Sequence, residues 1–366
     1  MDHESDQSLK KFAIVGCGRI ALRHAELIGG RQIKGAILVG VSDVKLERAE
    51  NIGNLYNVPA FSDMHAMMRA VAPDVVVVLT ESGNHARHVC DLAQYGADVI
   101  VEKPMALTID DADRMITTCN QHNVKLFVVK QNRFNLPVIK LRQALENGRF
   151  GKLILGTVRV RWCRTQQYYD QDPWRGTWEM DGGVLTNQAS HHIDLLEWMM
   201  GEVQSVFAYS STALAKIEAE DTATVVLRFA NGGLGVIEAT TATRPKNLEG
   251  SLSILGETGT VEISGFAVNK MRTWEFVHTN ENDHEILENY SCNPPDVYGF
   301  GHKSYYEHVI DCLTKGSPHL VDGLEGRKSL LLINAIYEAI ETQQEVFLKN
   351  FPKAARLGTT GHTSSV

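Results

Sequence analysis

Long hydrophobic runs are absent from this chain of 366 residues, and so are clusters of positive charge. No apolar stretch reaches the ~18 residues that a membrane-spanning helix needs, so we expect no such helix. Lys and Arg number 36 against 44 Asp and Glu, which gives a net charge of −8 with no basic run to offset it. We therefore expect neither nucleic acid nor an anionic membrane as a partner.

Paired cysteine motifs and a secretory leader are also missing. The first ten residues, MDHESDQSLK, are polar and acidic, so we expect no signal peptide and a cytoplasmic protein. The six cysteines are scattered without a C-x-x-C pair, which indicates reduced thiols, no disulfide framework and no zinc site. They are Cys17, Cys90, Cys119, Cys163, Cys292 and Cys312.

The segment Lys11–Ala21, KFAIVGCGRIA, has the pattern of a strand that turns sharply into a helix. Gly16, Gly18 and Ala21 have the spacing G-x-G-x-x-A, in which the glycines allow a tight turn and close approach of a pyrophosphate. The helix that follows directs its unpaired N–H groups toward the phosphates. We predict a dinucleotide site at this turn, with cofactor contacts from Gly16, Gly18, Arg19 and Ile20.

A second apolar strand, Ile37–Ser42, ends at Asp43, which lies somewhat beyond the usual spacing of about 20 residues after the glycines. A carboxylate at this position accepts hydrogen bonds from ribose hydroxyls and repels a 2′-phosphate. Asp43 therefore predicts NAD as the cofactor in preference to NADP.

From Lys11 to about Lys130, apolar strand patterns alternate with helical patterns. Strands this apolar, separated by helices, indicate a parallel sheet covered on both faces. Residues 1–130 are thus predicted to form a Rossmann domain. Ligands in such sheets bind beyond the carboxyl ends of the strands. The candidates there, in addition to the turn and Asp43, are Thr80, His85, Glu102 and Lys103.

After Asn132 successive strands follow one another with Gly-rich turns and little helix between them. This pattern predicts an α+β domain with an open, largely antiparallel sheet over residues 131–350, then a polar tail over 351–366. The predicted strands are Lys152–Arg164, Val203–Thr212, Thr222–Ala230, Leu234–Thr241, Ser251–Leu255 and Thr260–Ser264. Helices are predicted at Leu136–Asn147, Asn187–Met200, Gly301–Thr314 and Leu324–Gln343.

Two groups of residues have the chemistry of a catalytic site. Lys103 lies in Val99–Pro104, VIVEKP, where the following proline keeps the backbone extended. An ammonium there can hold a reacting hydroxyl or accept its proton.

The second group lies in DGGVLTNQASHHID, Asp181–Asp194. In one continuous helix, Asn187, His191, Asp194 and Trp198 would share a face. His191 can transfer a proton, Asn187 can donate or accept a hydrogen bond, and Asp194 could orient a histidine. His192 points away and is expected to pack or hydrogen-bond structurally. We predict no metal, because adjacent His191 and His192 diverge on a helix.

Together these motifs resemble the Gfo/Idh/MocA oxidoreductases over nearly the whole chain. The resemblance rests on GCGRIA, Asp43, VEKP and GGVLTNQASHHID, the last matching the family pattern G-G-x-L-x-D-x-G-x-H-x-x-D. It implies hydride transfer between nicotinamide and a carbinol carbon, with Lys103 as the catalytic lysine and His191 as the catalytic histidine. The family's usual Asp is Asn187 here and its Gly is Ala189, so Lys103 and His191 must move the proton.

The Asn and the preceding stretch RWCRTQQYYDQDPWRGTWEMDGGVL look most like the branch that oxidises C3 of UDP-N-acetylglucosaminuronate. That resemblance implies a UDP-sugar substrate converted to a 3-keto sugar in amino-sugar biosynthesis. Arginines can meet a diphosphate or carboxylate, and aromatic rings can stack on uracil or sugar. The substrate-binding residues expected on this basis are Lys103, Arg164, Tyr169, Trp174, Arg175, Asn187 and His191.

Two other functions are compatible with the sequence. One is a dehydrogenase of a free sugar or inositol, which would not need so many Arg and aromatic residues before the Gly-Gly turn. The other is a non-enzymatic NAD-binding regulator, which would need neither Lys103 nor His191. Apolar residues on both faces of the predicted strand at Leu234, Val236 and Ile237 also favour a homodimer or homotetramer formed through the second sheet.

Overall fold

The computed structural model describes residues 9–291, 299–353 and 355–359, which form two compact units. The first unit comprises the described residues up to Ala106, then Asp110–Val129 and His302–Arg327. The second comprises Leu107–Ile109, the described part of Lys130–Gly301, and the described residues from Lys328 onward. Cys292 and the end of the predicted polar tail lie outside the described residues.

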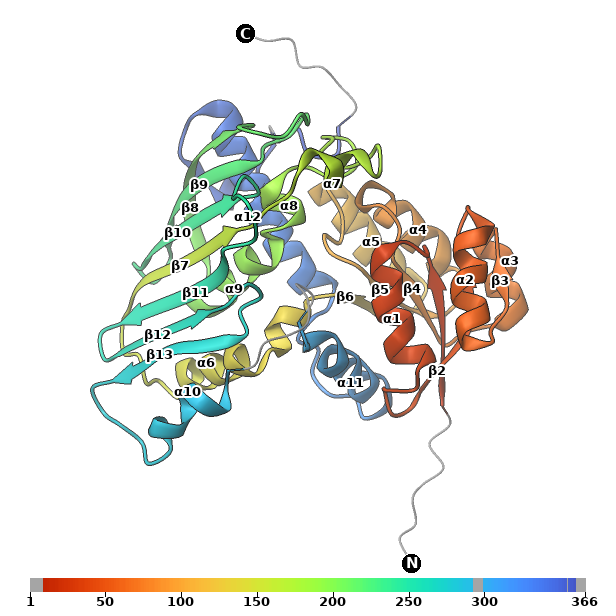
Figure 1. The fold of residues 1–366 in the computed structure, drawn as a ribbon, viewed down its shortest axis with the longest axis horizontal. Coiled ribbons are helices and arrows are strands. Elements are labelled where there is room, and N and C mark those ends of the chain that lie inside the picture. Colours follow the sequence, from red (N-terminus) through yellow and green to blue (C-terminus); the bar gives the residue numbers. More distant parts are fainter. Residues whose placement is uncertain (1–8, 292–298, 354, 360–366) are drawn as a thin grey trace, which may run out of the picture. The chain divides into compact units, whose positions relative to one another are not determined.

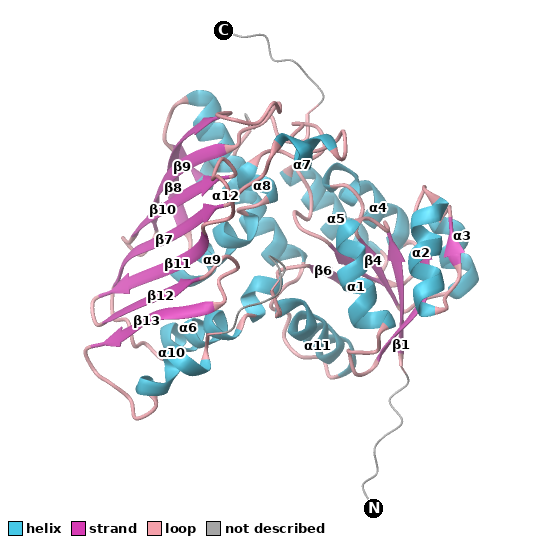
Figure 2. Ribbon diagram, in the orientation of Figure 1, coloured by secondary structure: helices cyan, strands magenta, loops and turns pink. Residues whose placement is uncertain are grey.

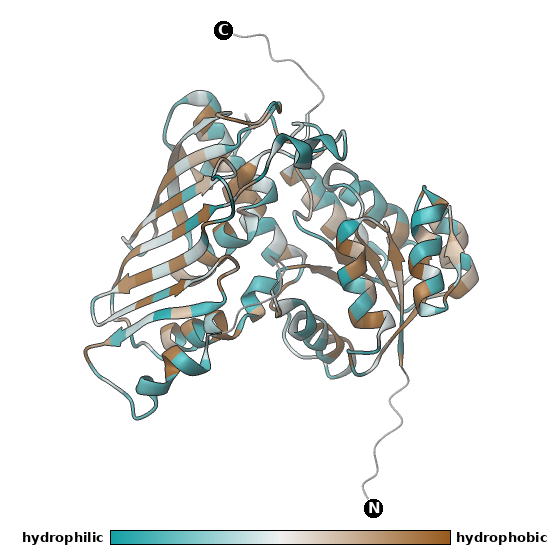
Figure 3. Ribbon diagram, in the orientation of Figure 1, coloured by the Kyte–Doolittle hydropathy of each residue, from teal (hydrophilic) through white to brown (hydrophobic). Residues whose placement is uncertain are grey.

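The first unit contains a six-stranded, entirely parallel sheet, which confirms the predicted Rossmann fold (Figures 1 and 2). Its strand order is β3-β2-β1-β4-β5-β6. All four residues of the central strand β4 are fully buried, as expected for a strand covered on both faces. The strands of this sheet are largely hydrophobic in Figure 3. The strands are β1 (Lys10–Val15), β2 (Ala36–Ser42), β3 (Ala60–Phe61), β4 (Val75–Val78), β5 (Asp98–Val101) and β6 (Leu126–Val128).

The helices of the first unit include one that comes from late in the chain. They are α1 (Arg19–Gly29), α2 (Leu46–Tyr56), α3 (Met64–Val71), α4 (His85–Ala93), α5 (Ile109–Gln121) and α11 (Gly301–Thr314). Tyr305 and Tyr306 of α11 are fully buried, and the Tyr306 ring packs edge-on against Phe12 of β1. The predicted division placed 131–350 in one domain, whereas His302–Arg327 belongs with the Rossmann sheet.

The second unit contains an eight-stranded sheet of order β13-β12-β11-β7-β10-β9-β8-β14 (Figure 2). It is antiparallel except for the pairing of β7 with β10, so the predicted largely antiparallel sheet is confirmed. The strands are β7 (Leu153–Arg161), β8 (Val203–Ser211), β9 (Thr222–Phe229), β10 (Leu234–Thr240), β11 (Glu249–Gly256), β12 (Gly259–Ser264), β13 (Lys270–Phe276) and β14 (Val346–Phe347).

Helices cover one face of this sheet, and α9 packs against β7 and β11. Gly156 of β7 makes room for α9, because a Cβ there would lie 2.6 Å from Cγ of Met200 and 2.7 Å from Cδ1 of Leu196. The helices of this unit are α6 (Leu136–Glu146), α7 (Gln166–Asp170), α8 (Val184–Asn187), α9 (Ser190–Met200), α10 (Ile286–Asn289) and the main part of α12 (Gly323–Thr342).

The predicted helix Asn187–Met200 is wrong at its start. The segment forms two helices, α8 and α9, and the break falls at Gln188 and Ala189. The Ala189 N–H donates to Val184 O at 2.8 Å. This bond spans five residues instead of the four of an α-helix, and α8 ends there. Asn187 is therefore not on the α9 face that carries His191, Asp194 and Trp198. The sequence analysis also missed β3, β13, β14, α3, α7 and α10.

The cysteines of the described residues, Cys17, Cys90, Cys119, Cys163 and Cys312, are free thiols. Within the same ranges, no helix combines the length and the apolar character that crossing a membrane requires.

Candidate functional site

The turn between β1 and α1 leaves its backbone accessible to a ligand. Gly16 has a φ of +92°, and a Cβ there would lie 2.7 Å from the carbonyl carbon of Leu79, so the position requires glycine. Gly18 is extended, and a Cβ there would meet no atom within 4 Å. The helix begins at Arg19, which is exposed, and Ile20, which is half-buried. This open turn at a helix N-terminus fits a pyrophosphate.

Asp43 follows β2, and two main-chain N–H groups hold its carboxylate. Cys17 N donates to Oδ2 at 2.7 Å, and Lys45 N donates to Oδ1 at 2.8 Å. Because Cys17 lies between Gly16 and Gly18, the carboxylate is tied to the turn. Burial and the Asp43 charge raise the pKa of the Cys17 thiol to about 12. This thiol stays protonated at neutral pH and is not a nucleophile.

The His85 ring joins the segments that follow β4 and β5. Its Nδ1 lies 2.8 Å from Pro104 O, and its Nε2 lies 3.0 Å from Thr80 O. Burial lowers the pKa of His85, and a neutral imidazole donates one N–H, so it satisfies one carbonyl at a time. Half-buried Thr80 also places Oγ1 2.9 Å from Nδ1 of His88. These contacts hold the segment after Lys103, while direct contact of Thr80 and His85 with the cofactor stays a prediction.

Glu102 holds the backbone of Lys103. Its Oε2 accepts the Lys103 N–H at 2.9 Å, and its Oε1 lies 3.1 Å from Nε2 of His24. Burial opposes charge here, but hydrogen bonds with His24 and His302 keep the pKa of Glu102 well below its usual range. Both oxygens of this buried, ionised carboxylate thus have protein partners. The structure gives Glu102 a supporting role, and its predicted contact with the cofactor stays a prediction.

His24, Glu102 and His302 also bring ligand-type atoms within 4.8 Å of one another in a buried position. The Nδ1 of His24 lies 2.5 Å from the hydroxyl of Tyr306, so the His24 ring connects Tyr306 to Glu102. Hydrogen bonding through His24 explains the positions of Tyr306 and Glu102, while Nε2 of His302 lies 3.9 Å from Oε1 of Glu102.

In the second unit, Asp194 is part of a buried ion cluster. Arg133 donates to it twice, from Nε at 2.8 Å and from Nη2 at 2.7 Å, and Lys130 Nζ donates to the same carboxylate. Lys130 also donates to Oγ of Ser329 at 2.8 Å. Burial raises the pKa of Asp194, but the two cations outweigh burial and lower it strongly. Asp194 is therefore committed to Arg133 and Lys130, and our suggestion that it orients a histidine is wrong.

His191 lies at the start of α9 and is half-buried. Its Nε2 is 3.0 Å from Nε2 of Gln131. An amide NH₂ group only donates, so Nε2 of His191 is the acceptor, and a neutral ring carries its hydrogen on Nδ1. This arrangement leaves a basic nitrogen on His191. The neighbouring His192 is buried against Trp162, and burial lowers its pKa to about 4, as expected for a structural histidine.

Glu220 holds the start of α8, the helix that ends at Asn187. Its main-chain carbonyl accepts from Val184 N at 2.9 Å, and its Oε1 accepts from Leu185 N and from the hydroxyl of Tyr337, both at 3.0 Å. Burial raises the pKa of Glu220 to about 7. The position of Asn187 is therefore fixed from the buried interior of the second unit.

Two of the predicted substrate-binding arginines flank one tyrosine. The Tyr168 ring lies 5.2 Å from the Arg164 guanidinium and 4.8 Å from that of Arg175. Arg175 also lies 4.5 Å from the Trp174 ring and donates to Asp172 at 3.1 Å. Arg164, Arg175 and Trp174 thus form one half-buried cationic and aromatic group.

Tyr169 is different from its neighbours in this segment. It is 6% exposed, its hydroxyl lies 3.0 Å from Oγ1 of Thr241, and burial raises its pKa to about 12. Tyr169 therefore packs in the core of the second unit. Tyr168, which we also expected to stack on the substrate, is half-buried and lies between the two arginines.

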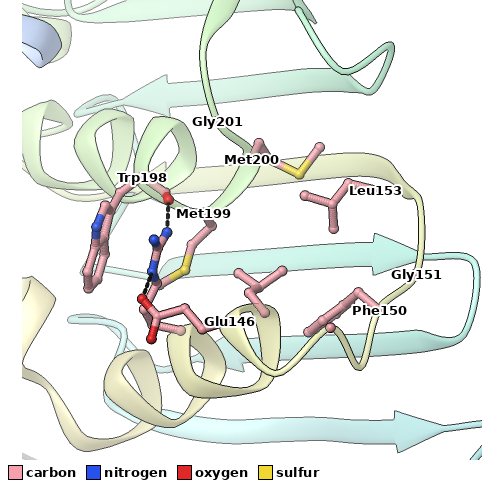
Figure 4. A pocket seen from close by; sticks show the side chains of 11 residues that line it. Glu146, Phe150, Gly151, Leu153, Trp198, Met199, Met200 and Gly201 are labelled. Atoms are coloured by element: carbon pink, nitrogen blue, oxygen red, sulfur yellow. Dashed lines mark hydrogen bonds and ion pairs between the residues drawn. The ribbon is translucent and has the colours of Figure 1, made fainter.

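A pocket of about 310 Å³ lies elsewhere in the second unit, between α6 and the end of α9 (Figure 4). The Arg142 guanidinium donates to Trp198 O at 2.5 Å and to Glu146 at 2.8 Å along its wall. Phe150 and Met200 supply apolar surface. None of the predicted site residues lines this pocket, so it is not the predicted substrate site.

Two family models describe most of the chain. Residues 10–130 match the NAD-binding Rossmann fold of an oxidoreductase family, and residues 142–348 match the C-terminal alpha/beta domain of the same family. The chain belongs to the Gfo/Idh/MocA oxidoreductase family. It is an NAD-dependent dehydrogenase, and the open turn at Gly16 and Gly18 and the carboxylate of Asp43 fit that cofactor.

Relatives within the Gfo/Idh/MocA family act on different substrates. The WlbA dehydrogenase from Bordetella pertussis, solved with NADH and UDP-GlcNAcA, is 40% identical, with a TM-score of 0.86 over 93% of this chain and 98% of that chain. The corresponding WlbA from Chromobacterium violaceum is 38% identical, with a TM-score of 0.87 over 94% of this chain and 96% of that chain. A myo-inositol 2-dehydrogenase from Thermotoga maritima is 29% identical over 93% of this chain and 98% of its own length.

Sequence reasoning missed three residues that support this Gfo/Idh/MocA site. They are Gln131, which contacts His191, His24, which contacts Glu102, and Asp181, which accepts a hydrogen bond from Asn187. The polar run KQNR at Lys130–Arg133, directly after the buried strand β6, could have indicated the first. His24 and Asp181 have no comparable local pattern.

Proposed function

We propose that this dehydrogenase oxidises the C3 hydroxyl of a UDP-N-acetylglucosamine-type sugar, foremost UDP-N-acetylglucosaminuronate, to the 3-keto sugar in amino-sugar biosynthesis. The observation that carries the proposal is the 40% and 38% identity to two dehydrogenases whose structures contain NADH and UDP-GlcNAcA. The identity to the myo-inositol 2-dehydrogenase is lower, at 29%.

The group around Tyr168 supports a nucleotide-sugar substrate. Arg164 and Arg175 carry two positive charges beside aromatic faces, and Asp172 offsets only part of that charge. Guanidinium groups bind diphosphates and carboxylates, and aromatic rings stack on bases and sugars. A neutral cyclitol such as inositol would make little use of this group.

We assign the chemistry to Lys103 and His191. Bound NAD, held by the Gly16–Gly18 turn and Asp43, supplies the hydride acceptor. His191 takes the hydroxyl proton on Nε2, where the substrate hydroxyl replaces the Gln131 amide as the partner of the single lone pair on that nitrogen. Lys103, whose backbone Glu102 fixes, stabilises the negative charge that develops on the hydroxyl oxygen.

The test compares substrates with the full-length protein. NADH absorbance is followed with NAD and either UDP-N-acetylglucosaminuronate or myo-inositol, and UDP binding is measured by calorimetry. We expect NADH formation with the UDP-sugar and binding of UDP alone. Turnover of myo-inositol without turnover of the UDP-sugar would favour the inositol hypothesis, and no turnover of either, with NAD bound, would favour the regulator.

Cofactor choice provides one prediction. Changing Asp43 to Ser removes the carboxylate that would repel a 2′-phosphate, so we expect the preference for NAD over NADP to narrow, and more so with an Arg added nearby. The measurement is the ratio of kcat/KM for the two cofactors. Asp110→Ser, at an exposed site where α5 begins, is the matched control and should leave the ratio unchanged. A wild-type enzyme that already uses both cofactors equally contradicts the prediction.

Self-association is a second proposal, through the sheet face that the helices leave uncovered. Tyr209, Val226 and Leu234 are exposed on that face by 63%, 51% and 50%. Exposed apolar surface of this kind is usually covered by a partner. We expect light scattering at micromolar concentration to give a homodimer or homotetramer, and Val226→Asp to weaken it. A wild-type protein that is only monomeric would contradict this.

A further inference from the structure

Buried Asp181 and half-buried Asn187 form a hydrogen-bonded pair in the segment before α9. Asp181 is 2% exposed, and its Oδ1 accepts from Nδ2 of Asn187 at 2.5 Å. Its Oδ2 accepts from Gly176 N at 2.9 Å. An ionised carboxylate has no hydrogen to donate, so the amide group turned toward Asp181 must be the NH₂ of Asn187. The amide oxygen of Asn187 is therefore directed to the opposite side.

From this geometry we infer that Asp181 is a positioning residue, which makes Asn187 present a hydrogen-bond acceptor to a hydroxyl of the sugar substrate. The inference rests on the proposed function and on the expectation from the sequence that Asn187 contacts the sugar substrate. Asn187 then offers an oxygen, as the Asp of the family pattern would, but without a charge. The negative charge lies on Asp181, behind the amide.

The pair also restricts which residues can occupy these positions. Two ionised carboxylates at this separation repel strongly, so a second Asp at position 187 would have to share a proton with Asp181. With the shared proton, a protonated Asp at 187 donates to Asp181 and still presents an oxygen outward. Without the shared proton, the two carboxylates repel each other and separate, and position 187 no longer presents its oxygen to the substrate.

Asp181 could also serve only to hold its loop, and the isosteric change Asp181→Asn separates the two roles. The introduced amide keeps an oxygen for the Gly176 N–H, while Glu220 continues to hold Val184 and Leu185. The NH₂ group of the introduced amide, however, requires the oxygen of Asn187. The Asn187 amide must then turn over and present a donor to the substrate.

The experiment uses Asp181→Asn, Asn187→Asp and the double variant, with kcat and KM for the UDP-sugar, NADH affinity and Tm measured over a range of pH. We expect Asp181→Asn to lower kcat/KM about 10- to 100-fold, the effect of one misplaced hydrogen bond, with NADH affinity and Tm nearly unchanged. Asn187→Asp should be active at low pH, where its new carboxyl group and Asp181 share a proton. It should lose activity as the pH rises and that proton is released. The double variant, with a single carboxylate, should regain activity and lose that dependence on pH.

Asn289→Asp is the matched control, because Asn289 donates to Glu285 at an exposed site. The change also places a new carboxylate beside an existing one, but solvent screens the repulsion between them. It should change neither activity nor its pH dependence. Wild-type kcat/KM in Asp181→Asn, or a double variant no better than the two single variants, would overturn the inference. If wild type oxidises myo-inositol but not the UDP-sugar, the proposed function fails, and the same series with inositol decides the role of Asp181.

Discussion

Replacing Lys103 with Met is expected to lower kcat by about 10²- to 10⁴-fold, the range of a single acid–base or charge-stabilising group. Methionine keeps the length of the side chain but removes the ammonium that stabilises charge on the hydroxyl oxygen. Glu102 bonds the main-chain N–H of Lys103, and this bond remains in the variant. NADH affinity should change little, because in the proposed function the Gly16–Gly18 turn and Asp43 hold the cofactor.

Single-turnover kinetics with the UDP-sugar and fluorescence titration with NADH measure the two effects of this change. Lys315→Met is the matched control, since Lys315 is 60% exposed and pairs with Asp311 on the surface of the same unit. The control should retain wild-type kcat. A Lys103→Met enzyme with kcat near wild type would show that the lysine takes no part in the reaction.

His191→Asn should also lower kcat strongly and should flatten the pH profile. A base must be unprotonated, so the wild-type rate is expected to fall as pH drops through the histidine pKa, which is ordinarily near 6.5. Asparagine cannot accept the proton. The measurement is kcat against pH for wild type and variant, with NADH affinity as a check on cofactor binding.

His284→Asn serves as the control, because His284 is 74% exposed on the second unit. Its profile should match that of wild type. If His191→Asn keeps both kcat and the shape of the pH profile, the base is Lys103 or a water molecule. Asn187→Ala should have a milder effect than either change, because we expect Asn187 to position the substrate, and a neutral amide accepts no proton.

The sequence was sufficient where a pattern repeats along one element. Runs such as Val75–Val78 are apolar at every position, which only a strand buried on both faces explains, and β4 is such a strand. Apolar residues occupy every second position from Ala223 to Phe229, as in a strand with one covered face. These are the positions that are buried in β9. Gly16 and Gly18 also behave as their spacing predicts, the first for its positive φ and the second for its open surroundings.

The sequence was insufficient where partners come from distant parts of the chain. The sequence around Glu102, for example, does not indicate its neighbours His24, at 3.1 Å, and His302, at 3.9 Å. The helix pattern of Asn187–Met200 continues through Gln188 and Ala189, and no Gly or Pro marks the break between α8 and α9 there. Asp181 and Asn187 are separated by a turn whose shape depends on Glu220, far along the chain.

Helix α11 has consequences for folding during synthesis and for any attempt to isolate the NAD-binding unit. Every strand of the Rossmann sheet has been synthesised by Val128, yet Tyr306, which packs against Phe12 and His24, is added only after nearly all of the second sheet. During biosynthesis the core of the first unit therefore stays partly exposed until α11 has been synthesised. A polypeptide truncated before α11 would contain the whole dinucleotide motif without a complete unit around it. An N-terminal fragment that ends before α11 consequently does not contain the complete NAD-binding unit.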